Sequence, residues 1–437
     1  MSRKEDKSPL RIALAGLGTV GTGTLQLLKA QDAILAQRCG RPLQVVAVAD
    51  LDCKRDRGVD MAGIACYDDA LKMIAEVDAD VVVELIGGSD GIAKAVCEAA
   101  LDGGRHVVTA NKALIAHHGL VLAQKAEKAG TVLAFEAAVA GGIPIIKALR
   151  EGLVGNNFTR ITGILNGTCN YILTNMRQTG KEFAIVLDEA QKLGYAEADP
   201  SFDVDGVDAA HKLAILTSVA FGCKIDFGAV HMEGIRNISA RDIALAGELG
   251  YRIKLFGITS RTEDGVEQRV HPCLVPLDAP LAHVEDVFNA VEVEGDYVGR
   301  STYEGRGAGD HPTASAVIAD IADIARGLRL SAFGVPVADL AEIPTQPMEN
   351  HCGAYYLRFT VKDAPGVLAA IATELAGEGI SLASMIQHDR AKGPSGSVSI
   401  VLTTHETIEA SMSRALAKIA VLDTVTEPPM LIRIQGE

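Results

Sequence analysis

A glycine-rich motif near the amino terminus restricts the fold of this 437-residue chain more than any other feature. Gly-Leu-Gly-Thr-Val-Gly occupies residues 16–21, directly after the apolar run RIALA and before a helical pattern that reaches about Arg38. In a strand–turn–helix unit, such glycines let the backbone approach a pyrophosphate, and the helix N-terminus offers free N–H groups. We therefore predict a dinucleotide-binding loop, with a plain glycine-rich turn as the alternative. Its cofactor-binding residues would be Gly16, Gly18, Thr19, Val20 and Gly21.

Apolar and helical segments alternate over the first part of the chain, which predicts an α/β fold. The runs PLQVVAVAD, VVVELIG, RHVVTAN and TVLAFEAA are typical of buried strands in a parallel, Rossmann-type sheet. The middle of the chain mixes helices and strands as an α+β domain does, and the last segment has the pattern of a small ferredoxin-like βαββαβ unit. We expect a Rossmann domain, a catalytic and dimerisation domain, a linker and a C-terminal domain, at 1–140 (plus 305–330), 141–304, 331–350 and 351–437.

Charge and composition argue against two broad classes of function. Lys plus Arg total 41 and Asp plus Glu total 56, so the formal net charge is −15 and basic surface for nucleic acid or acidic membrane is not expected. The charged start MSRKEDKSPL does not resemble a secretory signal, and no apolar stretch is long enough to span a bilayer. Eight scattered cysteines without a CxxC pair fit free thiols in a reducing cytoplasm better than a disulfide framework.

An acidic residue ends the second predicted strand. Asp50 stands where a carboxylate usually accepts the ribose hydroxyls of NAD. Lys54 and Arg55 follow directly and are suited to a 2′-phosphate, although both also fit a solvated loop. Asp50 is therefore a predicted cofactor-binding residue, and the choice between NAD and NADP stays open.

The densest group of ionisable residues lies between residues 190 and 212. Asp208 and Lys212 are four residues apart on a predicted helix and so share one face, a pair that a surface helix also produces by chance. Further carboxylates precede them at Glu197, Asp199, Asp203 and Asp205. A lysine held among carboxylates can transfer a proton to or from a carbonyl oxygen. Neighbouring acids raise a lysine pKa and burial lowers it, so the direction of the Lys212 shift stays open.

This segment resembles the signature of homoserine dehydrogenase: A-x3-G-Y-A-x2-D-P-x2-D-V-x-G-x-D-x3-K, from Ala190 to Lys212. Other motifs are similar to the same family, namely TANK, EAAVAGGIP, GILNGT and GAG, at residues 109–112, 136–144, 163–168 and 307–309. The resemblance covers about residues 10–330 and implies reversible reduction of L-aspartate 4-semialdehyde to L-homoserine by NADPH or NADH. Two rival readings are another Rossmann oxidoreductase acting on a related amino acid, and a non-catalytic nucleotide-binding sensor.

The resemblance also implies roles for individual residues. Lys212 would be the general acid, and Lys112 would lie between nicotinamide and substrate and share the proton transfer. Glu197 and Asp208 would bind the substrate ammonium group. The remaining cofactor contacts would come from Lys112, Gly194, Glu197 and Gly309.

The segment EAAVAGGIP implies a monovalent cation site, usually for sodium in the family. The ligands would be the Glu136 carboxylate and the backbone carbonyls of Val139, Gly141 and Ile143, since oxygen ligands suit a hard cation. The alternative is a buried glutamate at a hinge between domains.

The C-terminal segment resembles an ACT domain, a small module that binds amino acids and regulates enzymes. Asp363, Gly366 and Leu368 end a strand and start a helix there, and they are the predicted effector site. The module suggests feedback by L-threonine and side-by-side association into a homodimer or homotetramer. Ser381 replaces the Asn that many ACT domains carry, which leaves open a dimerisation appendage without a ligand.

Overall fold

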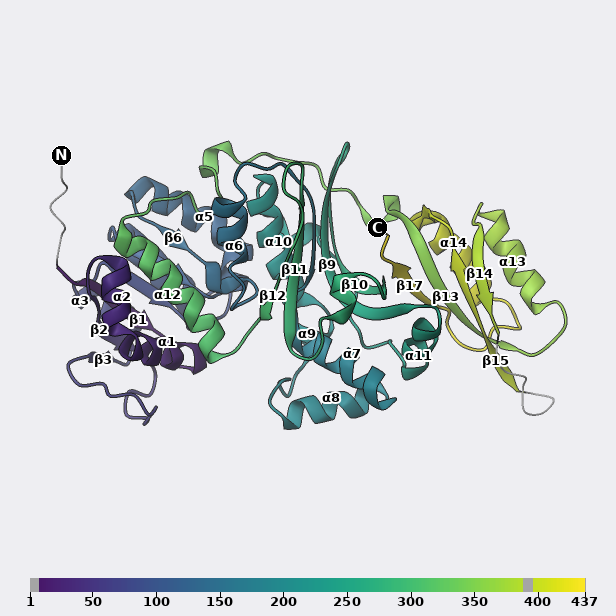
Figure 1. The fold of residues 1–437 in the computed structure, drawn as a ribbon, viewed down its shortest axis with the longest axis horizontal. Coiled ribbons are helices and arrows are strands. Elements are labelled where there is room, and N and C mark those ends of the chain that lie inside the picture. Colours follow the sequence, from purple (N-terminus) through teal and green to yellow (C-terminus); the bar gives the residue numbers. More distant parts are fainter. Residues whose placement is uncertain (1–7, 388–395, 437) are drawn as a thin grey trace.

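The protein is described by a computed structural model that covers residues 8–387 and 396–436. Three regions follow one another along the longest axis of the molecule, with the N-terminal sheet at one end and the C-terminal segment at the other (Figure 1). The middle region separates them and contributes most of the largest hydrophobic core.

The N-terminal region contains a six-stranded parallel sheet in the order β3-β2-β1-β4-β5-β6. That order is the one found in Rossmann folds, so the predicted fold class is confirmed. The valine-rich runs form strands because both faces of the sheet are covered: all four residues of β4 are buried. The strands are β1 (Leu10–Ala15), β2 (Leu43–Ala49), β3 (Ala65–Tyr67), β4 (Val81–Glu84), β5 (His106–Thr109) and β6 (Leu133–Ala134).

Helices cover both faces of this sheet. The prediction of a single helix that reaches about Arg38 is wrong, because the helix is interrupted at Gln31 and two helices form. The last helix, α12, packs against α1 from far along the chain, and Gly23 allows the close approach because a Cβ there would lie 3.1 Å from the Asp310 carbonyl oxygen. The helices are α1 (Thr19–Ala30), α2 (Asp32–Cys39), α3 (Ala70–Glu76), α4 (Ile92–Asp102), α5 (Lys112–Ala129) and α12 (Asp310–Arg326).

The middle region contains a mixed sheet with helices on one side. Its strands are β7 (Phe158–Ile164), β8 (His231–Met232), β9 (Tyr251–Thr262), β10 (Gly265–Pro276), β11 (Phe288–Gly295) and β12 (Gly299–Arg306). Its helices are α6 (Ile145–Lys147), α7 (Gly167–Thr179), α8 (Phe183–Lys192), α9 (Ser201–Val204), α10 (Val207–Phe221) and α11 (Ala240–Glu248). Short 3-10 or π segments lie at Glu136–Ala138, Ala148–Gly152, Phe227–Ala229 and Pro280–His283.

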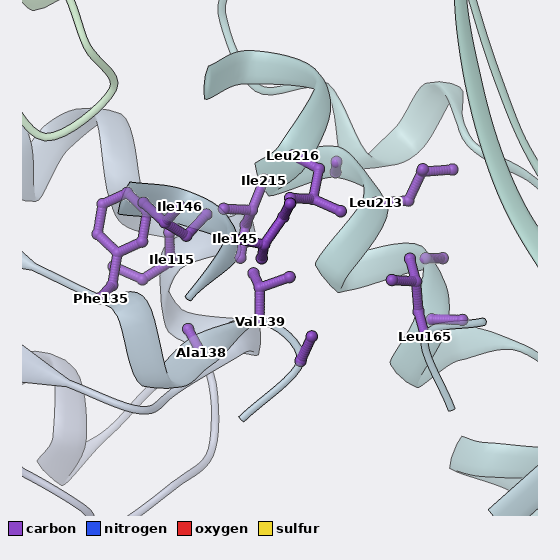
Figure 2. Packing of buried hydrophobic residues seen from close by; sticks show 14 of the residues in the cluster. Ile115, Phe135, Ala138, Val139, Ile145, Ile146, Leu165, Leu213, Ile215 and Leu216 are labelled. Atoms are coloured by element: carbon purple, nitrogen blue, oxygen red, sulfur yellow. The ribbon is translucent and has the colours of Figure 1, made fainter. Parts of the chain in front are cut away.

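Helix α10 is buried over almost its whole length and joins the first two regions. It contacts α5 on one side and β7, β9 and β10 on the other. Figure 2 shows Ile215 and Leu216 of α10 beside Ile145 and Val139, with Ile115 of α5 nearby. This apolar contact fixes the start of α10, with its ionisable residues, against the start of α5.

The C-terminal region has the predicted βαββαβ pattern. Its elements are β13 (Cys352–Lys362), α13 (Val367–Gly377), β14 (Leu382–Ile386), β15 (Ser397–Thr404), β16 (Thr407–Ile408), α14 (Glu409–Ala420) and β17 (Met430–Ile434). Strand β17 also pairs in parallel with β10, with Cys273 opposite Arg433. The middle and C-terminal sheets therefore form one continuous sheet of 11 strands, a junction that local sequence patterns do not reveal.

The predicted linker follows the surface of the middle region. It contains 3-10 turns at Val337–Asp339 and Met348–Asn350. Isolated bridges join Ala341 to Cys223 and Thr345 to Val266. These contacts hold the segment between α12 and β13 in place.

The expectation that all eight cysteines are free thiols is wrong for one pair. Cys53 and Cys66 form a disulfide, with Cα atoms 6.1 Å apart. The pair escapes sequence reasoning because the crossover from β2 to β3, not a short spacing, brings the two residues together. The other six cysteines are free, and all of them except Cys352 are buried.

Over the residues that the structure describes, no helix is long and apolar enough to cross a membrane. The cytoplasmic location expected from the sequence stays a prediction.

Candidate active site

The glycine loop connects β1 to α1 at the carboxyl edge of the parallel sheet. A Cβ on Gly16 would lie 2.5 Å from the Leu85 carbonyl oxygen, and one on Gly21 would lie 2.0 Å from the Gly16 carbonyl oxygen. Gly18, in contrast, has nothing within 4 Å of its Cβ position, so its outer side is open. It precedes Thr19 at the start of α1, where no side chain caps the helix. The cradle therefore fits a pyrophosphate held by the first-turn N–H groups of α1.

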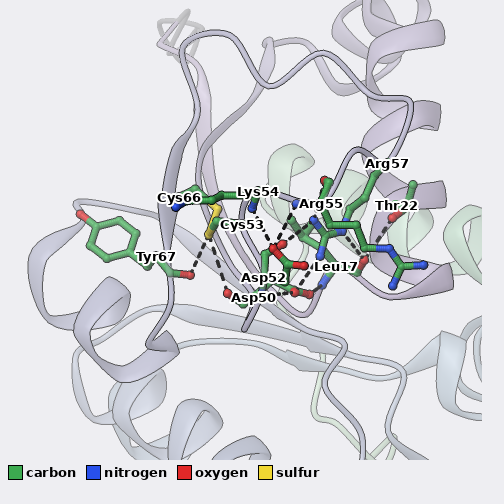
Figure 3. Close-up of polar contacts among 10 residues, drawn as sticks. All are labelled: Leu17, Thr22, Asp50, Asp52, Cys53, Lys54, Arg55, Arg57, Cys66 and Tyr67. Atoms are coloured by element: carbon green, nitrogen blue, oxygen red, sulfur yellow. Dashed lines mark hydrogen bonds and ion pairs between the residues drawn. A yellow bond between two sulfur atoms is a disulfide. The ribbon is translucent and has the colours of Figure 1, made fainter.

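Asp50 is held against this loop rather than free in solvent. Its carboxylate accepts hydrogen bonds from the Leu17 amide at 2.8 Å and the Asp52 amide at 3.0 Å, and it pairs with Arg57 at 2.7 Å (Figure 3). Burial opposes the charge, but these amides and Arg57 outweigh it and lower the pKa of Asp50. Arg57 was missed by sequence reasoning, which considered only Lys54 and Arg55. Its position four residues after Cys53 gave no local signal.

Asp208 and Lys212 are buried, and the half-buried Lys112 joins them in one cluster where α5 meets α10. The Asp208 carboxylate binds the Lys112 Nζ at 3.0 Å through Oδ1 and the Lys212 Nζ at 2.7 Å through Oδ2. Lys212 also donates to the Leu165 carbonyl oxygen at 2.7 Å. Lys112 is the first residue of α5, directly after β5, so it stands at the same edge of the sheet as the glycine loop. The residues predicted as catalytic therefore lie together, next to the predicted cofactor site.

The charges of this cluster stabilise one another. Burial alone would raise the pKa of Asp208, but the two lysine ammonium groups hold it well below its ordinary value. The Asp208 carboxylate in turn raises the pKa of Lys112. Burial and the Asp208 charge raise the pKa of Asp203. The cluster thus combines two cations with one firmly ionised carboxylate and a second carboxyl that is easier to protonate.

Asn166 orients the carboxylates and was given no role from the sequence. Its Nδ2 lies 2.8 Å from Asp203 Oδ1 and 2.8 Å from Asp208 Oδ2. Its Oδ1 accepts the Cys169 amide at 2.8 Å and so caps α7. An Asn before Gly167 in the motif GILNGT is a readable helix-cap signal, but its bonds to the carboxylates depend on tertiary packing.

The remaining acids of the signature separate into two groups. Glu197 is exposed, and its charge contributes to the raised pKa of Lys112 after the larger effect of Asp208. Its contact with a substrate stays a prediction. Asp199 accepts the Ser201 amide and Asp205 pairs with Arg236, which are local structural contacts. The segment therefore contains more carboxylates than the lysine–carboxylate cluster does.

Two predicted cofactor glycines lie at helix ends. Gly194 follows α8 with a φ of 77° and is exposed. Gly309 has a φ of 116° and precedes α12, whose start packs on α1. Their contact with a cofactor stays a prediction.

The predicted cation segment forms a tight turn between β6 and α6. Glu136 is buried, and its two carboxylate oxygens accept the amides of Ile146 at 3.0 Å and Lys147 at 2.8 Å. Burial and the nearby Asp320 raise the pKa of Glu136 to about 8. Ala140 has a φ of 55°, a left-handed conformation that non-glycine residues rarely adopt. Among the described residues no cluster of three or more His, Cys, Asp or Glu side chains could hold a metal.

The predicted effector loop is exposed at the start of α13. Gly366 has a φ of 90° and no side chain caps the helix there, while Leu368 packs against the C-terminal core. Asp363 lies in the same exposed loop. Ser381 lies beyond the other end of α13, a helix that is about 16 Å long at the usual helical rise.

A Rossmann sheet with an open glycine cradle, next to a buried lysine–carboxylate cluster, defines a dinucleotide-dependent oxidoreductase. Comparison with known proteins places the chain within that class. The homoserine dehydrogenase family profile matches residues 144–322, that family's NAD-binding domain matches 16–136, and the ACT domain matches 355–423.

Individual relatives agree with these profiles. Homoserine dehydrogenase from Neisseria gonorrhoeae is 47% identical, covering 98% of this chain and 99% of its own. The crystal structure of the enzyme from Thiobacillus denitrificans superposes with a TM-score of 0.92 at 44% identity, covering 98% of both chains. A hyperthermophilic archaeal homoserine dehydrogenase in complex with NADPH has a TM-score of 0.63 at 28% identity, covering 74% of this chain and 99% of its own.

The chain belongs to the homoserine dehydrogenase family. It is an NAD(P)-dependent oxidoreductase with a C-terminal ACT domain, as predicted.

Proposed function

We propose that this enzyme interconverts L-aspartate 4-semialdehyde and L-homoserine and that the Lys112–Asp208–Lys212 cluster carries the reaction. The observation that supports this most directly is the single Asp208 carboxylate bonded to both ammonium groups beside the cofactor edge of the sheet. Bound NAD(P)H supplies the hydride. The protein then has to orient the substrate and deliver one proton to its carbonyl oxygen.

Lys212 is the proposed proton donor. An ammonium group has three N–H donors, and two of them go to the Leu165 carbonyl and to Asp208. The third is available for the substrate oxygen, and the two fixed bonds restrict its direction. Lys112 assists from the other side of the same carboxylate, and its raised pKa keeps it cationic. Two adjacent cations favour the negative charge that develops on the oxygen.

Acidic groups bind the substrate ammonium group in this proposal. Glu197 and Asp208 are the predicted partners, and Asp203 lies beside Asp208 through their shared amide donor, Asn166. The proposed cofactor contacts are those predicted from the sequence: Gly16, Gly18, Thr19, Val20, Gly21, Asp50, Lys112, Gly194, Glu197 and Gly309. We also retain the domain limits 1–140 (plus 305–330), 141–304, 331–350 and 351–437 as a proposal.

Replacement of Lys212 by alanine tests the assigned chemistry. We expect Lys212→Ala to lower kcat for homoserine oxidation by about 10²- to 10⁴-fold, the usual contribution of a positioned acid or base. Cofactor binding, measured by NADPH fluorescence, should persist. The matched control is Lys192→Ala, which removes an exposed lysine paired with Asp188. Turnover at the wild-type rate in Lys212→Ala would disprove the role, and cofactor binding by the wild type without any turnover would indicate a sensor.

A monovalent cation is the second part of the proposal. Burial raises the pKa of Glu136 to about 8, and a cation beside the carboxylate would stabilise its ionised form. Among the described ion pairs none includes Glu136, because Lys147 is directed to Asp320 and Asp323. Sodium held by Glu136 and the carbonyls of Val139, Gly141 and Ile143 would neutralise that charge.

Regulation by L-threonine through the ACT domain is the third part. Asp363, Gly366 and Leu368 form the effector loop, and the Ser381 end lies a helix length away on the same chain. A second copy packed side by side would bring the two ends together, which fits a homodimer or homotetramer. The proposed regulation would act in the formation of threonine, methionine and isoleucine from homoserine.

The effector loop is best tested by a point variant. Deletion of the ACT domain would also remove β17 and uncover the edge of β10, so it cannot isolate regulation. We expect L-threonine to inhibit the wild type and to inhibit Asp363→Ala at least tenfold more weakly, with little change in basal kcat. Glu406→Ala, an exposed acid elsewhere in the domain, is the control. Equal inhibition of all three proteins would remove this loop from the mechanism.

A further inference from the structure

The disulfide stands beside the predicted cofactor site. Cys53 lies in the loop after β2, only three residues beyond Asp50, and Cys66 lies in β3 (Figure 3). Cys53 is half-buried, whereas Cys66 is exposed and open to a reagent in solution. Cys53 Sγ also lies 3.3 Å from the Tyr67 carbonyl oxygen, an acceptor within reach of a Cys53 thiol.

The bond closes a loop that carries three basic residues. Lys54, Arg55 and Arg57 all lie between the two cysteines. Arg57 is the best held of them: its Nε donates to the Leu17 carbonyl at 2.9 Å and its Nη2 bonds Asp50 at 2.7 Å. Leu17 belongs to the glycine motif. The closed loop therefore connects directly to the backbone that would receive the pyrophosphate and to the carboxylate that would receive the ribose.

The far end of this loop packs Val59, Met61 and Ile64 against the N-terminal core, but its only strand pairing is short. Strand β3 is three residues long and lies at the edge of the sheet, paired with β2 alone. Its registered partners are Ala47, Val48 and Ala49. Without the covalent bond, the loop between residues 53 and 66 would have many more conformations, and ordering it upon binding would cost free energy.

We propose that Cys53 and Cys66 form a reversible thiol–disulfide site that sets the affinity of the enzyme for its dinucleotide. The oxidised form holds Arg57 and Asp50 in the binding arrangement, and the reduced form binds the cofactor more weakly. A reversible bond reconciles the reducing cytoplasm expected from the sequence with the disulfide in the structure, because disulfides in reducing compartments are commonly transient and regulatory.

The chemistry is a thiol–disulfide exchange with a low-molecular-weight or protein dithiol. A thiolate of the dithiol attacks the exposed Cys66 sulfur, forms a mixed disulfide and releases Cys53 as a thiolate. The second thiolate of the reagent then attacks its own sulfur in that mixed disulfide and releases Cys66. Two electrons pass to the protein, each cysteine takes one proton, and the dithiol leaves as its disulfide. A disulfide oxidant such as oxidised glutathione reverses the exchange and leaves as two thiols.

Of the six free cysteines, five are buried and therefore shielded from such a reagent. Burial raises the pKa of the Cys97, Cys169 and Cys273 thiols, which keeps them protonated and unreactive. Cys352 is exposed, but it stands at the start of β13, far from the cofactor edge. It is therefore the matched control.

The bond itself is tested by mass spectrometry of the full-length protein after equilibration with oxidised glutathione or dithiothreitol. Trypsin cleaves after Lys54, Arg55 and Arg57 but not between Arg41 and Pro42, so peptides 39–54 and 58–72 stay joined only through a bond to Cys66. Peptide 39–54 also carries Cys39, and fragmentation of the joined pair identifies Cys53 as the partner. We expect the joined peptides in the oxidised sample and their separation in the reduced one. Absence of the joined peptides after oxidation would overturn the proposal.

The function of the bond is tested by kinetics on the same two samples. KM is measured for NADPH and for NADH. We expect reduction to raise KM at least threefold for one or both of these cofactors, with kcat little changed. Cys66→Ser and Cys53→Ser should both show the reduced value under all conditions, and Cys352→Ser should behave as the wild type. A change below threefold for both cofactors, or a change in the opposite direction, would overturn the proposal even if the bond forms. The wild-type comparison decides the question if either serine variant fails to fold.

Discussion

Asp208 is the residue on which the site depends, because it binds two lysines that arrive from different regions of the chain. Lys112 comes from α5 beside the parallel sheet, and Lys212 comes from α10 one turn after Asp208 itself. A buried carboxylate is costly unless it is paired and hydrogen-bonded. Here two ammonium groups and the Asn166 amide satisfy it. The same arrangement holds both proposed proton donors at a fixed separation.

Glu136 supports a prediction about pH at the residue scale. Its pKa is raised to about 8 in the folded protein, whereas glutamate in an unfolded chain titrates near 4.3. Between these values the folded state binds more protons, so the free energy of unfolding should fall as pH rises, by at most about 1.4 kcal/mol per pH unit. We expect Glu136→Gln to flatten the Tm profile between about pH 5 and 8. Glu263→Gln, in the exposed hairpin between β9 and β10, is the control.

The same variant tests the cation. A bound cation would offset the loss of stability, so the wild type at pH 8 should have a higher Tm in sodium chloride than in choline chloride. Glu136→Gln should lose that difference. An unchanged pH profile would contradict the pKa argument, and an equal effect of sodium on both proteins would contradict the cation site.

At the scale of elements, strand ends explain why the site lies where it does. Parallel strands present their carboxyl ends at one edge, so the glycine loop, Asp50 and Lys112 meet there after β1, β2 and β5. Helix α10 adds its N-terminal turn to this edge because its apolar length is buried between α5 and the mixed sheet. The position of an ionisable residue at an element's end thus follows from the apolar pattern of the element.

Substitutions at two glycines of the loop distinguish an effect on stability from an effect on cofactor binding. A Cβ on Gly21 would meet the Gly16 carbonyl at 2.0 Å, while Gly18 is open to solvent. We expect Gly21→Ala to destabilise the protein by about 1–3 kcal/mol, as overpacking does. Gly18→Ala should change stability by less than about 0.5 kcal/mol yet raise KM for NADPH about tenfold, because the methyl group occupies the approach of the pyrophosphate. Thermal unfolding and cofactor titration measure the two effects. Wild-type KM in Gly18→Ala would show that the cofactor does not approach this face.

Some elements could be predicted from local sequence patterns, whereas others depend on tertiary packing. The glycine motif and the valine-rich runs were enough to predict the parallel sheet, because its strands are buried on both faces. The break at Gln31 was missed because the residues around it retain a helical pattern. The tie between Asn166 and the carboxylates was missed because its partners lie 37 and 42 residues away.

At the scale of the whole molecule, the ACT domain is built into the catalytic sheet. Strand β17 runs between β10 and β13, and Arg433 on it bonds Glu233 at 2.8 Å and Glu409 at 2.6 Å. The Tyr355 hydroxyl donates to the same Glu409. Burial opposes the charge of Arg433, but the two carboxylates outweigh it and raise its pKa. The ACT domain and the middle region are therefore joined by backbone hydrogen bonds and by a buried ion-pair network.

Arg433→Met tests this junction. Removal of one partner from a buried ion pair leaves the other charge uncompensated and costs about 3 kcal/mol. We expect a lower Tm and weaker coupling between L-threonine binding and inhibition, with basal kcat less affected. Arg414→Met, which breaks an exposed pair with Glu378, should change neither. Calorimetry and inhibition curves give the answer, and a wild-type Tm in Arg433→Met would rule out a structural role for the junction.

The sequence by itself determined the Rossmann domain, the βαββαβ tail and the residues of the signature, because hydrophobic periodicity and motif spacing are local properties. Apart from the Asp208–Lys212 pair, which helical spacing already indicated, only the tertiary structure decided which charged groups meet. It joined Lys112 to Asp208, bonded Arg57 to Asp50, paired Cys53 with Cys66 and placed Arg433 between two glutamates. These contacts join positions from 7 to 200 residues apart, and they depend on how whole strands and helices pack.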